Sequence, residues 1–228
     1  MRVHIAEACG FCYGVRRAVE LASTAEKGTH TLGPIIHNPQ LVNSLSARGV
    51  SPVDSLQDVA DGSKVLIRSH GVGPHVYEEA EAKHLDVVDA TCPHVKKAQQ
   101  DARKVINDKK ALIIVGEKDH PEVISISQWG CNRAIIIDKV EEAKEIPYCE
   151  HMGVVVQTTF SQSRFKQIES VLAEKTDDLD VYMTICTATR QRQEAAVELA
   201  KKVDAMIVIG GKNSANTGRL AQVCAEQG

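Results

Sequence analysis

The stretch Asp86-Val87-Val88-Asp89-Ala90-Thr91-Cys92-Pro93-His94-Val95-Lys96-Lys97 decides the fold, because its pattern occurs three times in the chain. A short strand-like run leads to a cysteine, and a helix with basic residues in its first turns is expected directly afterwards. The same order surrounds Cys12, which lies between residues 4–8 and Val15-Arg16-Arg17. It also surrounds Cys186, which lies between residues 181–185 and Arg190-Gln191-Arg192. This repetition predicts three related structural units.

Apolar runs rich in β-branched residues alternate with amphipathic stretches along the chain. The alternation predicts an α/β fold of three pseudo-symmetric units, each a mostly parallel sheet flanked by helices, around a central site. We place the units at residues 1–88, 89–183 and 184–228, which carry Cys12, Cys92 and Cys186 in that order. The predicted strands are 65–68, 111–115, 134–137, 154–157 and 206–209, and the predicted helices are 15–26, 94–107, 161–174 and 191–202.

The third unit is shorter than the other two. In each of the first two units, two further strands follow the cysteine, and each of these strands leads into a polar loop. The chain ends before the third unit reaches its second loop. By comparison with the repeat period, we expect the third unit to be incomplete by roughly 40–50 residues.

Composition and charge exclude several classes of protein. The 228 residues are 43% hydrophobic and 25% charged, which is typical of a soluble globular protein. A net charge of −3 and an aromatic content of 4% argue against nucleic acid as the main partner. No apolar run reaches the roughly 20 residues of a membrane helix, and the N-terminus does not resemble a signal peptide. We therefore expect a cytoplasmic protein without a membrane or nucleic-acid partner.

The three recurrent cysteines are candidate metal ligands. In a reducing compartment, the seven cysteines are expected to be ligands, catalysts or core residues rather than disulfides. A helix N-terminus favours the thiolate, so we expect lowered thiol pKa values at these three positions. Three thiolates suit an iron–sulfur cluster with one iron left open, and they also suit zinc with a bound water. Three buried core cysteines are the alternative without a metal. The cysteines outside the pattern, which we take as structural, are Cys131, Cys149 and Cys224.

Polar side chains follow the predicted strands in all three units. The histidines among them are His37, His70 and His120, and Ser214 and Asn216 occupy the matching loop of the third unit. N–H and O–H donors that converge on one pocket suit an anion such as a diphosphate, although each histidine taken singly could be a surface or capping residue.

Glu122 and Thr158 are the candidate proton-transfer pair. Glu122 follows Pro121 at a predicted helix start, where any carboxylate interacts favourably with the helix dipole. In a pocket the same carboxyl could relay a proton, and Thr158 could position that proton or a water, unless it is an ordinary strand residue.

Cys9-Gly10-Phe11-Cys12 supports a different hypothesis, a thiol–disulfide oxidoreductase of the thioredoxin type. That hypothesis does not explain Cys92, Cys186 or the repeated units. A binding module without catalytic function, in which the cysteines belong to the core, is the third hypothesis.

Seven short motifs, in order over essentially the whole chain, resemble the 4-hydroxy-3-methylbut-2-enyl diphosphate reductase family, the last enzyme of the non-mevalonate isoprenoid pathway. They are Gly10-Phe11-Cys12-Tyr13-Gly14-Val15, Gly33-Pro34-Ile35-Ile36-His37-Asn38, Ser69-His70-Gly71-Val72, Asp89-Ala90-Thr91-Cys92-Pro93, His120-Pro121-Glu122-Val123, Gln157-Thr158-Thr159 and Lys212-Asn213-Ser214-Ala215-Asn216.

The resemblance implies a reductive dehydroxylation that yields isopentenyl and dimethylallyl diphosphates and water. It implies one [4Fe–4S] cluster on Cys12, Cys92 and Cys186, with one iron not bound by protein. It also implies catalytic roles for Glu122, Thr158 and His120, and a ferredoxin or flavodoxin as electron donor. The residues that it implies for substrate binding are His37, His70, His120, Ser214 and Asn216.

The chain departs from the family pattern at two places. Ala215 stands where the family usually has a second serine, and if that hydroxyl reaches phosphate its loss costs on the order of 1–3 kcal/mol. The family also continues into a Ser/Thr loop that holds diphosphate, and this chain ends before it. We therefore expect the 228-residue chain to bind a cluster and yet to be inactive or weakly active.

Overall fold

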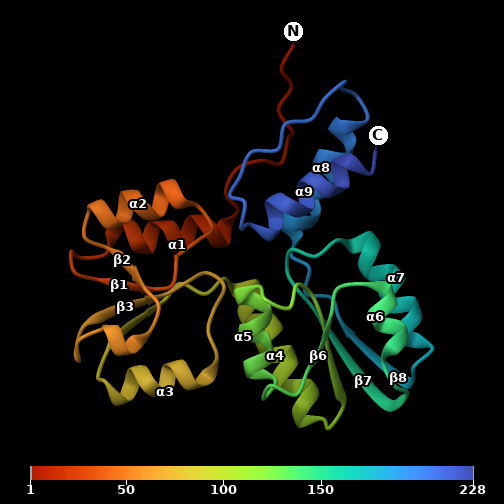
Figure 1. Ribbon diagram of the computed structural model, residues 1–228, viewed down its shortest axis with the longest axis horizontal. Coiled ribbons are helices and arrows are strands. Elements are labelled where there is room, and N and C mark those ends of the chain that lie inside the picture. The colour runs from red at the N-terminus through yellow and green to blue at the C-terminus, as the bar shows by residue number, and fades with distance from the viewer. Residues whose placement is uncertain (1, 228) are drawn as a thin grey trace.

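A computed structural model of the chain describes residues 2–227. Two lobes each contain a four-stranded sheet covered by helices, and a third lobe consists of two helices and long loops (Figure 1). The three lobes meet at a common centre. All six strand pairings within the two sheets are parallel. The predicted α/β class is confirmed, and the sheets are wholly rather than mostly parallel.

The first sheet has the strand order β2-β1-β3-β4. Its central strand β3 is buried on both faces, and consecutive side chains of a strand point to opposite faces. Leu66 therefore packs with Ala18 and Ala22 on one side, and Val65 and Ile67 pack with the core on the other side. The elements are α1 (Tyr13–Thr24), β1 (His30–Leu32), α2 (Pro39–Ala47), β2 (Ser51–Val53), η1 (Leu56–Asp58), β3 (Lys64–Ile67), α3 (Pro74–Ala82) and β4 (Asp86–Asp89).

The second sheet has the order β6-β5-β7-β8. Its four strands are therefore arranged in the same order, relative to their sequence, as the four strands of the first sheet. Its buried strand β5 divides its side chains in the same way, with Ile113 and Val115 in one core and Leu112 and Ile114 in the other. The elements are α4 (Pro93–Asn107), β5 (Ala111–Val115), α5 (Pro121–Trp129), β6 (Ile135–Ile137), α6 (Val140–Glu145), β7 (Cys149–Val156), α7 (Gln162–Ala173) and β8 (Thr176–Tyr182). The identical topology supports the internal repeat.

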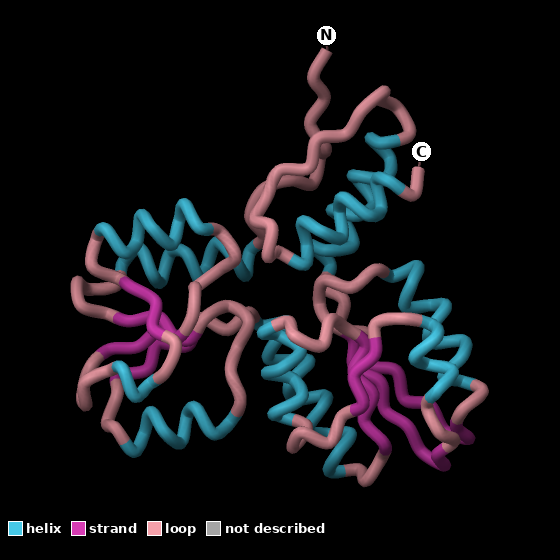
Figure 2. Tube along the Cα trace, in the orientation of Figure 1, coloured by secondary structure: helices cyan, strands magenta, loops and turns pink. Residues whose placement is uncertain are grey.

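The third lobe contains α8 (Thr187–Ala200) and α9 (Ala215–Ala225) and no strand within the described residues. The strand-like pattern of residues 4–8 and the predicted strand 206–209 are therefore wrong, and both are loops (Figure 2). A strand needs a neighbouring backbone to pair with, and neither segment has one in residues 2–227. Their apolar side chains stay in solvent: Ile5 is 78% exposed, Ile207 85% and Ile209 91%.

The remaining predicted elements exist; β5 has the predicted bounds, and the others have shifted ends. The helices after the cysteines begin up to four residues earlier than predicted, because each cysteine is itself the N-cap residue. Strand β7 begins five residues earlier than predicted, because its first residues pair with β8. The unit boundaries at 88 and 183 stay a prediction.

Candidate active site

Cys12, Cys92 and Cys186 occupy equivalent places in the repeat, as the N-caps of α1, α4 and α8. The backbone N–H of Cys92 donates to the Ser69 carbonyl at 3.0 Å, and that of Cys186 donates to the Thr158 carbonyl at 3.1 Å. Each of these two cysteines is therefore held by the loop that follows the partner strand of the strand before it: β3, the partner of β4, for Cys92, and β7, the partner of β8, for Cys186. This is how the fold directs thiols at the ends of different helices towards one place.

The thiols of Cys12 and Cys186 lie close enough to the Cys92 thiol to act on it electrostatically. Burial raises the pKa of the Cys92 thiol, and the nearby Cys12 and Cys186 raise it further, although backbone N–H groups of His94 and Val95 act in the opposite sense. The expectation of a lowered pKa is therefore wrong for Cys92, because the desolvation of the thiolate outweighs the helix N-terminus. A bound metal would reverse the balance, since a coordinating thiol is deprotonated.

Gly14 is necessary for this packing. A Cβ atom at this position would come 2.5 Å from the Cys92 Sγ atom. The first turn of α1 therefore lies directly against the thiol of the second lobe. Sequence reasoning did not single out Gly14, although it stands two residues after Cys12 in a helix, where glycine is unfavourable without a packing reason.

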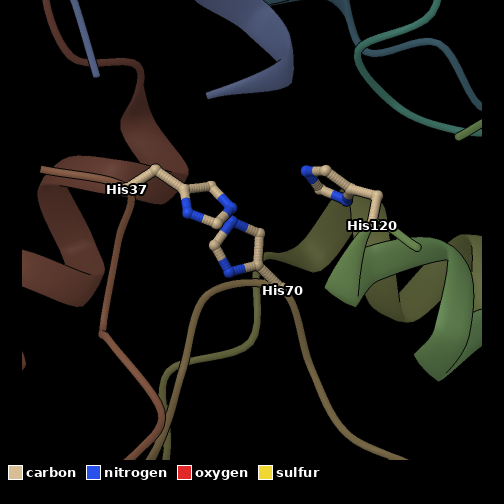
Figure 3. A group of neighbouring side chains, drawn as sticks. All are labelled: His37, His70 and His120. Atoms are coloured by element: carbon tan, nitrogen blue, oxygen red, sulfur yellow. The ribbon is translucent and has the colours of Figure 1, made fainter. Parts of the chain in front are cut away.

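The rings of His37, His70 and His120 gather at one point, although they come from three separate loops (Figure 3). The ring centroids are 4.3 Å apart for His37 and His70, 5.6 Å for His37 and His120, and 5.5 Å for His70 and His120. His37 follows β1, His70 follows β3, and His120 is the N-cap of α5. The structure thus brings together the three histidines that the sequence singled out.

The three imidazoles are neutral at pH 7. Burial lowers the pKa of His37, and it lowers the pKa of His120 to about 4. The pKa of His70 lies well below its ordinary value, because of burial first and then of the other two imidazoles. The guanidinium of Arg68 lowers all three pKa values further. Arg68 was missed by the sequence reasoning, and its only signal is its place two residues before His70.

A hydrogen bond decides what His120 can offer to a ligand. Its Nδ1 atom accepts from the backbone N–H of Glu122 at 3.1 Å, so a neutral ring carries its proton on Nε2. Nitrogen atoms of the three histidines lie within 4.8 Å of one another, as in a metal site. However, a protonated Nε2 is a donor and not a metal ligand. The arrangement therefore favours an anion over a cation.

Glu122 and Thr158 form a buried acid–hydroxyl pair. One carboxyl oxygen of Glu122 accepts from the Thr158 backbone N–H at 2.6 Å, and the other bonds the Thr158 hydroxyl at 2.9 Å. Burial raises the pKa of Glu122 to about 7, although the two hydrogen bonds from Thr158 oppose the shift. A carboxyl with this pKa can give up or take a proton near neutral pH.

A cavity of about 650 Å³ is lined by His37, His120 and Asn213 among others, whereas Glu122, Thr158 and His70 are not part of its lining. Asn213 comes from the third lobe, so the cavity is shared between lobes. The predicted donors Ser214 and Asn216 lie just beyond Asn213, outside the cavity wall in the part of the chain described. Ser214 is the N-cap of α9 and accepts from the Thr217 N–H, which leaves its own hydroxyl proton free to donate.

Three equivalent helix N-termini point at this region. Asn38, His120 and Ser214 are the N-caps of α2, α5 and α9, which occupy the same position in the three repeats. Free N–H groups and the helix dipole make such termini binding sites for anions. The molecule therefore has one set of three helix N-termini at the cysteines and another at the histidines.

The other cysteines take no part in this arrangement. Cys9 and Cys131 are exposed, Cys149 is partly exposed, and Cys224 is buried. Within residues 2–227 no disulfide is present, and Cys9 is not joined to Cys12.

Comparison with known proteins finds relatives that match nearly the whole chain. The profile of the LytB protein family matches residues 3–228. A protein from Pelobacter propionicus called 4-hydroxy-3-methylbut-2-enyl diphosphate reductase is 46% identical, over 99% of this chain and 81% of its own length. A protein of the same name from Thermoanaerobacter sp. is 44% identical, over 98% of this chain and 80% of its own length.

Two solved structures have the same fold. The E-1-hydroxy-2-methyl-but-2-enyl-4-diphosphate reductase of Plasmodium falciparum superposes with a TM-score of 0.90 at 28% identity, covering 96% of this chain and 71% of its own. A second structure, described as the terminal enzyme of the non-mevalonate pathway, has a TM-score of 0.74 at 41% identity and covers 99% of this chain and 82% of its own. On the match of the family profile and the identity to these relatives, the chain belongs to the LytB protein family.

Proposed function

We propose that this chain is an iron–sulfur reductase that removes the allylic hydroxyl of 4-hydroxy-3-methylbut-2-enyl diphosphate. The substrate takes up two electrons and two protons, the C–O bond breaks, and the products are water and either isopentenyl or dimethylallyl diphosphate. The observation that carries the proposal is that the N-cap cysteines of three repeats lie near Cys92, and that the carbonyl that accepts from the Cys186 N–H belongs to Thr158, which holds the buried Glu122 carboxyl. The family and the names of the relatives support the same reaction.

Cys12, Cys92 and Cys186 would hold one [4Fe–4S] cluster. The donor set fits, because Cys12 and Cys186 act electrostatically on Cys92, and because Gly14, where an added Cβ would lie 2.5 Å from Cys92 Sγ, allows α1 to approach that thiol. When bound, such a cluster supplies electrons and one Lewis-acidic iron that is open to the substrate. Zinc fits the same thiols but has no redox chemistry, so it does not support a reduction.

The diphosphate would occupy the meeting point of α2, α5 and α9. Nε2–H of His120 donates to it, and His37 and His70 offer further ring N–H groups. Ser214 donates its hydroxyl, and the Asn216 amide follows it in the first turn of α9. Neutral donors of this kind bind an anion without carrying a charge of their own, and the Arg68 guanidinium supplies positive potential from behind the rings.

Glu122 would supply the proton that leaves with the hydroxyl as water. Its carboxyl is about half protonated at pH 7, and Thr158 keeps both carboxyl oxygens in place. His120 is coupled to the same turn, because it accepts from the Glu122 N–H. Binding of the diphosphate and placement of the proton are therefore connected through one helix start.

The electron donor and the location belong to the same proposal. An acidic redox protein of the ferredoxin or flavodoxin type would deliver the electrons, and the reaction would take place in the cytoplasm. No helix among the described residues is long and apolar enough to cross a membrane.

Anaerobic single-turnover assays test the function. The reconstituted chain is mixed with the substrate and a low-potential chemical reductant, and the products are separated by chromatography. We expect slow formation of both isoprenoid diphosphates by the unmodified chain and none by Cys186→Ser, with Cys131→Ser as the matched control. A Cys186→Ser chain that forms the products as fast as the unmodified chain would contradict the proposal.

A further inference from the structure

Arg219 on α9 is one of the most buried charged side chains in the described chain, with 7% of its surface exposed. Its guanidinium lies 4.9 Å from the centre of the Phe160 ring and donates to the Gln222 side chain at 2.6 Å. Its Nη2 atom is 3.7 Å from the Glu117 carboxylate. The side chain therefore leaves the third lobe and inserts into the second.

The two residues that Arg219 contacts in the second lobe belong to the loops of the active site. Glu117 lies three residues before His120, and the His120 N–H donates to the Glu117 carbonyl at 2.9 Å. Phe160 lies two residues after Thr158. The Gln157 side chain joins the loops, because it accepts from the Glu117 N–H at 2.9 Å. Arg219 thus contacts both loops at the point where they are tied together.

A second arginine makes this placement costly. Arg164 lies 5.8 Å from the centre of the same Phe160 ring and donates to the same Gln222 oxygen at 3.4 Å. Burial and the neighbouring Arg164 both disfavour the charged form of Arg219. Burying a cation beside a like charge is unfavourable unless it makes specific contacts. Glu117, Asp138 and Glu226 favour the charged form, and of the contacts that compensate, those with Glu117 and Phe160 join the lobes.

The position of Arg219 on its helix connects it with the diphosphate donors. Arg219 stands three residues after Asn216, so the two side chains lie on the same side of α9. At the other end of the loop, Gly211 lies against the His37 carbonyl, where an added Cβ would collide. The start of α9 is thus held between the first lobe at Gly211 and the second lobe at Arg219.

We propose that Arg219 is a positioning residue that docks α9 onto the loops of His120 and Thr158, and so places Ser214 and Asn216 over the histidines. The inference rests on the proposed function for the identity of the ligand. It predicts that loss of Arg219 weakens diphosphate binding through misplacement of α9, and not through loss of a charge that faces the ligand.

Hydrogen–deuterium exchange of the reconstituted chain tests the docking without any activity. In Arg219→Met we expect faster exchange of the amides of residues 213–217, with unchanged exchange in β5 and β7. Arg219→Lys keeps the charge but lacks the planar, multiple-donor group, so it should be intermediate. Lys201→Met at the C-cap of α8, where the exposed Lys201 pairs with Glu198, is the matched control. Unchanged exchange at 213–217 in Arg219→Met overturns the proposal.

Titration with inorganic diphosphate separates positioning from charge neutralisation. We expect Arg219→Met to bind it about tenfold more weakly or worse, with unchanged iron content and a KM that rises more than kcat falls. If Arg219 only neutralised Glu117, Arg219→Met/Glu117→Gln would recover the affinity, and this recovery would overturn the proposal. We expect the double variant to remain weak. Failure of the unmodified chain to bind diphosphate counts against the proposed function, and the exchange measurement still decides the role of Arg219.

Discussion

Replacement of Glu122 by glutamine tests the buried acid–hydroxyl pair on which the proton step depends. The neutral amide can keep both hydrogen bonds: its oxygen accepts from the Thr158 N–H, and its NH2 group donates to the Thr158 hydroxyl. The variant therefore removes the titratable proton and preserves the geometry. Cluster content and diphosphate affinity should be unchanged, and turnover should fall by a factor of about 10²–10⁴.

The magnitude of a second effect follows from the pKa of Glu122. The folded-state pKa is about 7, compared with an ordinary value of 4.5. Between these values the unfolded chain has released the proton and the folded chain still holds it, so stability falls as pH rises. A difference of roughly 2.5 pKa units corresponds to about 3 kcal/mol. This loss is complete above pH 7, and Glu122→Gln does not suffer it.

Urea denaturation of both chains, cluster-free and under reducing conditions, measures this effect. The free energy of unfolding of Glu122→Gln relative to the unmodified chain should rise by about 3 kcal/mol between pH 4.5 and pH 8. Titration of the histidines is common to both chains and cancels in the difference. A difference that stays constant over this range would refute the burial of an ionisable carboxyl. Turnover that is unaffected by the substitution would remove Glu122 from the proton step.

Three further predictions concern the surroundings of the same site. Thr158→Val removes a hydrogen bond that lowers the pKa of Glu122, so this pKa should rise above about 7. In the pH–rate profile, the loss of activity at high pH should therefore begin at a higher pH. An unchanged profile would contradict the pairing of Glu122 with Thr158. Gly14→Ala brings a Cβ atom against Cys92 Sγ and should lower the amount of iron bound per chain. The control is Gly218→Ala on α9, where an added Cβ meets nothing within 4 Å, and this variant should bind iron normally. Equal iron contents in the two variants would show that the close approach at Gly14 is unimportant. His70→Leu removes one hydrogen bond to a charged ligand and should weaken the binding of inorganic diphosphate about 10- to 100-fold, as measured by calorimetric titration. Unchanged binding would show that the diphosphate binds elsewhere.

The features that could be predicted from the sequence are those determined by local pattern. Cys92 stands between a short strand-like run and Pro93, which is favoured in the first turn of a helix, so its place at a helix N-terminus can be predicted from neighbouring residues. The grouping of His37, His70 and His120 followed from their places after strands of parallel sheets. The repetition of the pattern extended each local inference to a second and a third unit.

The features that could not be predicted depend on contacts between distant residues. Residues 4–8 and 206–209 have the composition of strands, but strand formation needs a partner that composition does not specify. The raised pKa of Cys92 depends on how deeply its thiol is buried, and helix position alone suggested the opposite. Arg68 and Arg219 resemble ordinary surface arginines in the sequence, because only the packed lobes show what surrounds each guanidinium.

The central claim is that Cys12, Cys92 and Cys186 together hold one cluster, and the amounts of iron and acid-labile sulfide per chain test it most directly. After anaerobic reconstitution we expect about four of each in the unmodified chain and in Cys131→Ser, whose cysteine is exposed and lies outside the repeat. Each of Cys12→Ser, Cys92→Ser and Cys186→Ser should lose the cluster. A full cluster retained in any one of these three variants, or zinc in place of iron in a folded chain, would contradict the account.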